Sequence, residues 1–266
     1  MKIKTYRRTA QLLTVFAIFF IPLLNVYELY FVKGTFISMD IGDAAMADPL
    51  AVFQSMLAAG RVNEYMLGSV VIPVVLMLLL GRVWCSWFCP YYLCAEFMTW
   101  LRKKLKMKPY KPVFKDSVHV RQSKFRYSFL FIGLVLMCIA GVPILNLISA
   151  PGIISTQAML IVKFHYVTFE LVFFLILLVL ELFYFRFWCR LFCPTGTFLS
   201  FFRWKRGMTV EKVRSECSDC LSCVRSCPMM INPMTMGASS HCNNCGDCVD
   251  ICPDNRKEDT LKFTFK

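Results

Sequence analysis

The chain has 266 residues, 14 of them cysteine, and 57% of its residues are hydrophobic. Its mean hydropathy of +0.55 lies far above that of soluble domains, which excludes an ordinary soluble enzyme. The formal net charge of +13 suits either a nucleic acid or a membrane surface, and the positions of the basic residues decide between them.

Four apolar stretches follow one another along the chain, each about 20 residues long, which is the length needed to cross about 30 Å of hydrocarbon. No signal-peptide cleavage pattern follows the first stretch, so we predict that it is retained as a helix. The sequence therefore predicts an α-helical membrane protein with four transmembrane helices, near residues 10–30, 65–84, 127–148 and 168–187.

Lysine and arginine are distributed unevenly between the two sides that these helices define. All but three of the 30 Lys and Arg residues lie on the side that carries both termini, the exceptions being Lys33, Arg61 and Lys163. Cytoplasmic segments of membrane proteins are enriched in these residues. We therefore predict a multi-pass protein with both termini in the cytoplasm. Topology and contact with membrane lipid then explain the charge, and no nucleic acid is expected as a partner.

The loop after the first predicted helix contains Asp48 followed by Pro49. Aspartate is a preferred helix N-cap, and proline is favoured at the first helical position. The pair predicts a short helix over residues 49–59, capped by Asp48 and lying on the membrane surface.

An internal repeat appears when the chain is aligned with itself at an offset of 104 residues. The sequences WCSWFCP, beginning at Trp84, and WCRLFCP, beginning at Trp188, then coincide, each at the cytoplasmic end of an even-numbered predicted helix. We therefore predict a membrane domain over residues 1–207, made of two parallel two-helix repeats over about 1–104 and 105–207. Repeats of two spans each have the same orientation, so an axis near the membrane normal is expected to relate them.

The repeated motif places two cysteines four residues apart, directly before a proline. Cysteines at this spacing share one face of a helix, and the proline forces the residue before it out of helical geometry. If the two motifs meet, four thiolates converge, which is the usual ligand set of an iron–sulfur centre. Redox-active thiol pairs and a packing role are the alternatives. The candidate residues are Cys85, Cys89, Cys189 and Cys193.

Eight cysteines near the C-terminus form two copies of C-x2-C-x2-C-x3-C-P, the ligand run of two-cluster bacterial ferredoxins. Zinc sites typically pair two C-x2-C units instead. In these ferredoxins the fourth cysteine of each run binds the cluster of the other run. We expect one 4Fe–4S cluster on Cys217, Cys220, Cys223 and Cys252, and a second on Cys242, Cys245, Cys248 and Cys227.

The segment that carries these runs, residues 208–266, is predicted to be a cytoplasmic ferredoxin-like domain with two 4Fe–4S clusters. It is too short to bury a large core, so its clusters must supply most of its folding energy. The reducing cytoplasm suits cysteines that serve as thiolate ligands. The sequence contains no C-x-x-C-H, nucleotide-binding fingerprint or hydrolytic triad, which excludes covalently bound c-type haem and gives no sign of catalysis by the chain alone.

Together these features resemble the NapH-type membrane iron–sulfur proteins and the C-terminal membrane half of NosR-type regulators. The resemblance covers nearly the whole chain. It rests on the four predicted helices, the two C-x3-C-P motifs, the segment ADPLA at residues 47–51 and the twin ferredoxin runs. Cys94, whose counterpart in the second repeat is Phe198, departs from the pattern and is expected to be a buried thiol.

The resemblance implies a quinol dehydrogenase-type oxidoreductase subunit in a bacterial inner (cytoplasmic) membrane. It implies that electrons pass from the quinone pool to other iron–sulfur or cytochrome c redox subunits, in an anaerobic respiratory chain of the nitrate or nitrous oxide type. Two other functions stay open. One is relay of electrons from a cytoplasmic ferredoxin or flavoprotein to a periplasmic partner or metal ion, and the other is redox sensing or assembly.

A quinol site is much less visible in the sequence. Quinol oxidation needs a group that accepts protons, and ionisable residues at membrane depth are functional candidates. Glu28 and His165, near the outer ends of predicted helices, are the candidates. Each also has a structural explanation, because Glu28 can satisfy a neighbouring helix and His165 can lie in an interfacial belt.

Overall fold

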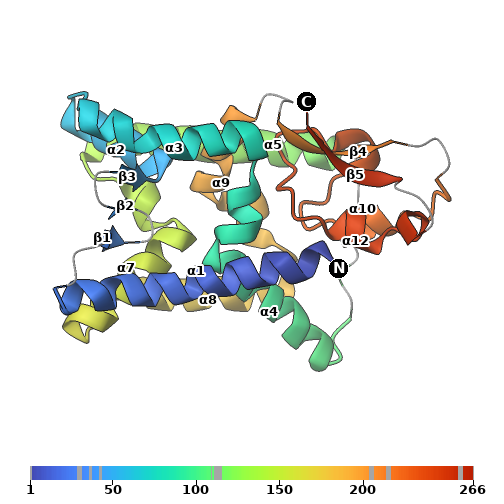
Figure 1. Ribbon diagram of the computed structural model, residues 1–266, viewed down its shortest axis with the longest axis horizontal. Coiled ribbons are helices and arrows are strands. Elements are labelled where there is room, and N and C mark those ends of the chain that lie inside the picture. Colours follow the sequence, from blue (N-terminus) through green and yellow to red (C-terminus); the bar gives the residue numbers. More distant parts are fainter. Residues whose placement is uncertain are drawn as a thin grey trace.

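The structure is a computed structural model, which describes residues 2–28, 32–35, 38–41, 44–108, 110, 116–203, 207–213, 217–256 and 260–265. Helices run along its long axis, and a small domain with two strands occupies one end (Figure 1). Both chain termini lie at this end, as the even number of predicted spans requires.

The first repeat contains two long helices, a small antiparallel sheet and a short helix between them. The sheet has the strand order β1-β2-β3, with Gly34 opposite Met39 and Met39 opposite Met46. Its elements are α1 (Ile3–Val26), β1 (Val32–Thr35), β2 (Ser38–Ile41), β3 (Ala44–Ala47), α2 (Pro49–Ala59), α3 (Glu64–Leu80), the π-helical turn η1 (Trp84–Phe88) and α4 (Pro90–Lys104).

The second repeat follows the same plan without the sheet. Its elements are α5 (Asp116–Ala140), α6 (Ile144–Leu147), α7 (Ala150–Phe164), α8 (Phe169–Phe183), the π-helical turn η2 (Trp188–Phe192), α9 (Pro194–Phe198) and the 3-10 helix η3 (Leu199–Phe202). Helices α2 and α7 correspond, since each begins with a proline in its first turn and precedes the second predicted span of its repeat.

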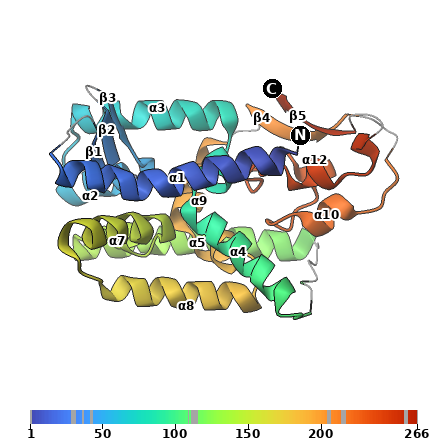
Figure 2. The same ribbon diagram turned by 60° about the horizontal axis from the view of Figure 1, so that its bottom comes forward.

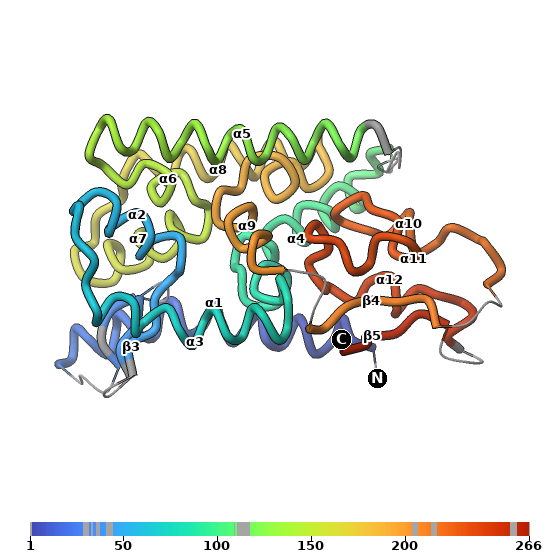
Figure 3. The backbone as a smooth tube through the Cα atoms, turned by 90° about the horizontal axis from the view of Figure 1, so that it is seen from above, coloured from blue at the N-terminus to red at the C-terminus, as the bar shows by residue number. Residues whose placement is uncertain are grey.

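The two repeats have the same orientation and interlock. Helices α1 and α5 both begin at the end with the small domain, and α3 and α8 run back towards it (Figure 3). Helix α1 packs on α7, α2 on α5 and α4 on α8, and Figure 2 shows α7, α5 and α8 stacked on one side of α1. One buried cluster joins the repeats, with members Tyr91, Ala95, Ala150, Ile153, Phe174, Leu177 and Trp188.

The predicted spans agree with the structure only in part. Among the described residues, two helices are long and apolar enough to cross a membrane, Ile3–Val26 and Val118–Ala140. The second and fourth predicted spans are the shorter helices α3, with 17 residues, and α8, with 15. Tyr30, the predicted end of the first span, lies outside the described residues.

The prediction for the third span was wrong at its outer end. Helix α5 stops at Ala140, because Gly141 adopts a φ of +66° and Pro143 follows it. The chain then forms α6 and α7 before α8 begins. No helix was predicted between the third and fourth spans, but α7 lies there, with Pro151 in its first turn.

The first and last strands of the C-terminal domain pair with each other. Strand β4 pairs antiparallel with β5, with Val210 opposite Phe263, and the chain between them wraps around a core that contains Cys223, Cys248 and Cys252. The elements are β4 (Met208–Lys212), α10 (Ser222–Ser226), α11 (Pro233–Met236), α12 (Asp247–Ile251), the 3-10 helix η4 (Asp254–Arg256) and β5 (Leu261–Phe265). The predicted domain boundary falls directly before β4, and residues 204–206 at this junction lie outside the described residues.

Gly207 lies where the C-terminal domain meets α3, and alanine there should lower stability. Its φ is +77°, and an added Cβ would lie 2.4 Å from the carbonyl oxygen of Leu78. Strained backbone of this kind costs about 1–3 kcal/mol, so we expect Gly207→Ala to lower the melting temperature in detergent. Gly68→Ala in α3 is the control, because its Cβ would meet no atom within 4 Å, and it should leave the melting temperature unchanged or raise it. Equal melting temperatures for the two variants would contradict the close contact.

Candidate metal centres and their connection

The four motif cysteines meet in one cavity. The cavity has a volume of about 30 Å³ and lies where η1 of the first repeat approaches η2 of the second. Its lining includes Cys85, Cys89, Cys189 and Cys193, together with Arg82, Trp84, Tyr92, Pro151, Thr195, Gly196, Met229 and Asn243. The structure thus brings together all four cysteines that the repeat predicted, from two segments about a hundred residues apart.

The two motifs fold in the same way, for a local reason. In each, a π-helical turn ends at the second cysteine, and a new helix begins at the following proline. Cys89 has φ −77° and ψ 118°, and Cys193 has φ −60° and ψ 109°. Proline disfavours helical geometry in the residue before it, so the prediction that each motif leaves the helix at this cysteine is confirmed.

The cavity lining carries hydrogen-bond donors directed at sulfur. The backbone N–H of Gly196 donates to Cys193 Sγ over 3.3 Å, and Arg82 Nη2 lies 3.9 Å from Cys85 Sγ. The buried hydroxyl of Tyr92 makes no hydrogen bond within the described residues. A buried polar group normally has a partner, so this lining fits a negatively charged group held by the four sulfurs.

No group of three or more His, Cys, Asp or Glu side chains in the described ranges is arranged around a single metal ion.

The two ferredoxin runs share one backbone conformation. Asp219 and Asn244 occupy the same place in the two runs and have φ of +46° and +51°. Leu221 and Gly246 also correspond, with φ of +56° and +77°. Alternation of left-handed and right-handed residues turns successive N–H groups to one side, which forms a nest for an anionic group such as an iron–sulfur cluster.

Cysteines of the two ferredoxin runs lie beside one another in this domain. A second cavity, of about 10 Å³, is lined by Cys227, Cys242, Cys245 and Cys248. Cys227 belongs to the first run and the other three to the second. Cys252 of the second run packs with Cys223 of the first. Burial raises the pKa of the Cys227 thiol to about 12, because surroundings of low polarity disfavour the charged thiolate.

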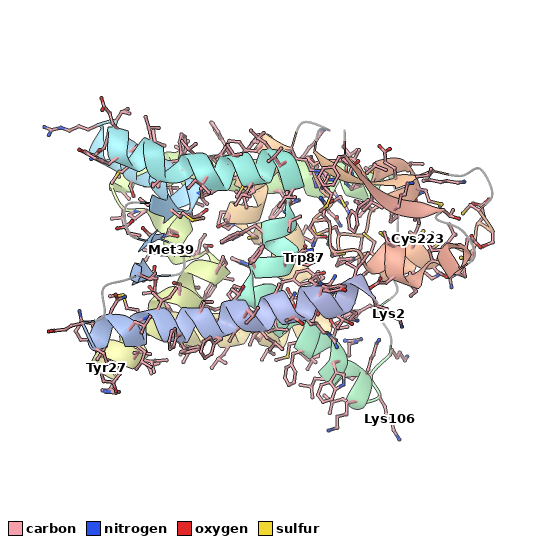
Figure 4. The ribbon with its side chains drawn as sticks, in the orientation of Figure 1. Lys2, Tyr27, Met39, Trp87, Lys106 and Cys223 are labelled. Atoms are coloured by element: carbon pink, nitrogen blue, oxygen red, sulfur yellow. The ribbon has the colours of Figure 1, made fainter. Side chains whose placement is uncertain are left out.

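The two cavities adjoin each other. Met229, which is 4% exposed, and Asn243 line both of them. Ser86 Oγ of η1 donates to the Asn243 carbonyl over 2.6 Å, and Trp87 Nε1 donates to the Asn244 carbonyl over 3.2 Å. Trp87 lies in the middle of the molecule on the side of the ferredoxin-like domain (Figure 4). The four-cysteine cavity is therefore in direct contact with the backbone of the second ferredoxin run.

Buried arginines fix this contact, and the sequence analysis missed their role because it treated them as a topology signal. Arg7 donates to the Cys245 carbonyl, Arg82 to the Ser240 carbonyl and Arg203 to the Cys242 carbonyl. The arginines at this contact are 0–4% exposed, and they are Arg7, Arg82, Arg126 and Arg203. An arginine within an apolar motif, such as Arg82 between Gly81 and Val83, is the sequence feature that could have revealed this role.

His241 completes this layer of buried basic groups. Arg126 Nη1 donates to His241 Nδ1 over 3.0 Å. Burial and the nearby guanidinium groups of Arg126 and Arg82 lower the pKa of His241 to about 3, so the ring is neutral and its nitrogen can accept. Arg82 and Arg126 supply positive charge beside the motif cysteines, and such charge stabilises thiolates in a buried site.

A third cavity adjoins the four cysteines on the outer side. It has a volume of about 280 Å³ and shares Trp84, Pro151 and Thr195 with the four-cysteine cavity. Its other lining residues are Met39, Met46, Ala47, Asp48, Pro49, Pro73, Leu76, Met77, Leu80, Gly81, Val83 and Phe88. The predicted cap is confirmed, since Asp48 accepts from the Leu50 N–H at the start of α2.

The two quinol candidates from the sequence lie elsewhere. Glu28 is exposed just after the end of α1, and His165 is the exposed residue at the C-terminal end of α7. Neither lines any of the three cavities described above. Cys94 packs as a half-buried thiol against the core between the repeats, outside the four-cysteine cavity.

Comparison with known proteins agrees with this geometry. A family model described as a 4Fe-4S binding domain matches residues 63–108 and 166–212, the segments that contain the two C-x3-C-P motifs. The uncharacterized protein MJ0750 of Methanocaldococcus jannaschii is 31% identical over 68% of this chain and 72% of its own length. No solved structure matches the chain.

Two named relatives are ferredoxin-type proteins. The methylamine utilization ferredoxin-type protein MauN of Methylorubrum extorquens is 27% identical over 88% of this chain and 78% of its own length. The ferredoxin-type protein NapH of Escherichia coli is 26% identical over 76% of this chain and 67% of its own length. The chain is a ferredoxin-type iron–sulfur electron-transfer protein, and it belongs to the NapH-type family.

Proposed function

We propose that this protein is a membrane-bound subunit that oxidises quinol and passes the electrons through its iron–sulfur centres to partner redox proteins. The proposed setting is an anaerobic respiratory chain of the nitrate or nitrous oxide type, with other iron–sulfur or cytochrome c subunits as partners. The observation that carries the proposal is the contact between cavities. The four motif cysteines line one cavity, the second ferredoxin run lines the next, and Met229 and Asn243 line both.

The proposed ligand sets follow from spacing and packing. One 4Fe–4S cluster is held by Cys217, Cys220, Cys223 and Cys252, a second by Cys242, Cys245, Cys248 and Cys227, and a third iron–sulfur centre by Cys85, Cys89, Cys189 and Cys193. Such centres supply one-electron storage and transfer. The chain's own residues hold the sulfurs, donate hydrogen bonds to them and exclude water from the space between the cavities.

The proposed topology has four spans, α1, α3, α5 and α8, with the ferredoxin-like domain and both termini in the cytoplasm of a bacterial cell. Large apolar side chains stand exposed on all four helices, among them Phe16 at 63%, Leu79 at 55%, Ile139 at 79% and Val179 at 56%. Such surfaces are costly in water and suit lipid. Helices α3 and α8 cover only about 22–26 Å, and flanking residues or local thinning of the bilayer accommodate short spans.

A second candidate is electron flow in the opposite direction, from a cytoplasmic donor. A cleft of about 660 Å³ lies between the N-terminus, the end of α4 and the ferredoxin-like domain, and Pro228 and Ile251 beside two cluster cysteines line it. Basic residues outnumber acidic ones in its lining, and the basic ones are Lys2, Lys4, Arg8, Arg102, Lys103, Arg186 and Arg225. An acidic ferredoxin or flavoprotein would match this charge.

Anaerobic mixing of the full-length protein in nanodiscs with a menaquinol or ubiquinol analogue separates these functions. Quinol oxidation predicts that the paramagnetic signals of reduced clusters appear after mixing. Clusters that stay oxidised with quinol but fill from a strong low-potential donor would favour the cytoplasmic donor. Intact clusters that neither donor reduces would favour a sensing or assembly role.

A further inference from the structure

We propose that the cavity of about 280 Å³ beside the four cysteines is the quinol-binding pocket, reached from the lipid past Leu76 of α3 and Phe88 of η1, and that Asp48 accepts the protons of the quinol. The inference rests on the proposed function and names the place and the proton acceptor of the reaction.

The lining of this cavity suits an apolar ring with a long tail. Fourteen of its fifteen lining residues are uncharged, mostly methionine, aliphatic and aromatic side chains. The rings of Trp84 and Phe88 lie 5.3 Å apart on its wall. Small-molecule sites usually have volumes of about 300–1,000 Å³, and the volume of this cavity lies near the lower limit of that range. Such sites are mostly apolar and contain a few polar groups, as this cavity does.

The cavity reaches the lipid-facing surface. Leu76 of α3 and Phe88 of η1 both line it, and they are 43% and 37% exposed. A quinol can therefore enter sideways from the membrane past these two side chains, with its ring inside and its tail in the lipid.

Asp48 is the one ionisable side chain among the described residues that line the cavity. Burial raises its pKa to about 6, although hydrogen bonds from the Leu50 and Ala51 N–H groups act in the opposite direction. A base with a pKa close to the working pH is efficient in proton transfer. The carboxylate also lies at the N-terminus of α2, where the helix dipole favours its charged form before it takes a proton.

Hydroquinone loses two protons and two electrons as its two O–H bonds break, and the product is the quinone. Each proton goes to a carboxylate oxygen of Asp48 and from there to water. Oxidised iron–sulfur centres would accept the two electrons one at a time, and Cys85, Cys89, Cys189 and Cys193 behind Trp84 would hold the nearest of them.

The alternative explanation is that Asp48 only caps α2, and one substitution separates the two roles. Asparagine caps a helix as well as aspartate does, but it cannot take a proton. Asp48→Asn should therefore preserve folding and cluster content while it slows cluster reduction by quinol about 10²- to 10⁴-fold. Asn63, whose side chain accepts from the Tyr65 N–H at the start of α3, is the matched cap, and Asn63→Asp should leave the rate unchanged.

Binding is measured separately from reduction, with a photoreactive azidoquinone and the full-length protein in nanodiscs. We expect the label on cavity residues in both the native protein and Asp48→Asn. Met77→Trp should fill the cavity and abolish labelling, whereas Leu79→Trp, at a position 55% exposed and outside the lining, should not.

The outcomes distinguish this inference from the proposed function. If quinol reduces the native clusters but the label lies elsewhere, or Asp48→Asn reacts at the native rate, the pocket or its proton acceptor is wrong and quinol oxidation stands. If quinol does not reduce the native clusters at all, the proposed function fails, and this inference fails with it.

Discussion

Replacing Cys193 with serine is expected to abolish reduction of the ferredoxin clusters by quinol, while a strong low-potential donor still reduces them. The reason is the position of the four-cysteine cavity, which shares walls with the proposed quinol pocket on one side and with the second ferredoxin run on the other. An iron–sulfur centre held in the four-cysteine cavity would link the proposed quinol pocket to the second ferredoxin run. Stopped-flow mixing of the variant in nanodiscs, with both donors, measures the effect.

Two other thiols provide matched controls for this substitution. Cys94 packs beside the cavity without lining it, and Cys138 is exposed on α5. Cys94→Ser and Cys138→Ser should be reduced by quinol at the native rate. Native rates for Cys193→Ser would show that electrons bypass the four cysteines.

Arg7→Leu is expected to weaken the attachment of the ferredoxin-like domain strongly. The Arg7 side chain is fully buried, pairs with Glu96 and lies 3.0 Å from Asp247 across the domain junction. Removal of one member of a buried ion pair costs about 3–5 kcal/mol, because the partner charge stays buried. We expect a lower melting temperature and faster proteolytic release of the C-terminal domain.

Arg8→Leu is the control, since Arg8 is 55% exposed and lies 3.9 Å from the same Glu96. An exposed pair contributes about 0–1 kcal/mol, so this variant should behave like the native protein. Similar losses for Arg7→Leu and Arg8→Leu would mean that the buried contact does not hold the domains together.

Short sequence patterns predicted the structural elements that depend on a few neighbouring residues. Proline geometry predicted the break at Cys89 and Cys193, and the Asp48-Pro49 pair predicted a helix over residues 49–59, which the structure has as Pro49–Ala59. The 104-residue repeat predicted that two distant motifs have equivalent surroundings. These features depend on a few adjacent residues, so one sequence is enough to find them.

The sequence could not reveal features that depend on how distant elements meet. Helix α7 was missed because proline and glycine near its start resemble a turn, although its N-terminus packs at the shared cavity wall through Pro151. The buried arginines were interpreted only as a topology signal, since their carbonyl partners lie up to 238 residues away. Asp48 was assigned a cap alone, because only the folded chain shows a cavity beside it.

We expect the four motif cysteines to hold an iron–sulfur centre in contact with the ferredoxin clusters. Iron and acid-labile sulfide per chain, measured on the anaerobically purified full-length protein, decide whether this centre exists. Two 4Fe–4S clusters account for about 8 iron atoms, and a third centre of two or four irons on four cysteines raises the total to about 10–12. A total of about 10–12 iron atoms, with matching sulfide, is the result we predict, and a total of about 8 would contradict the third centre.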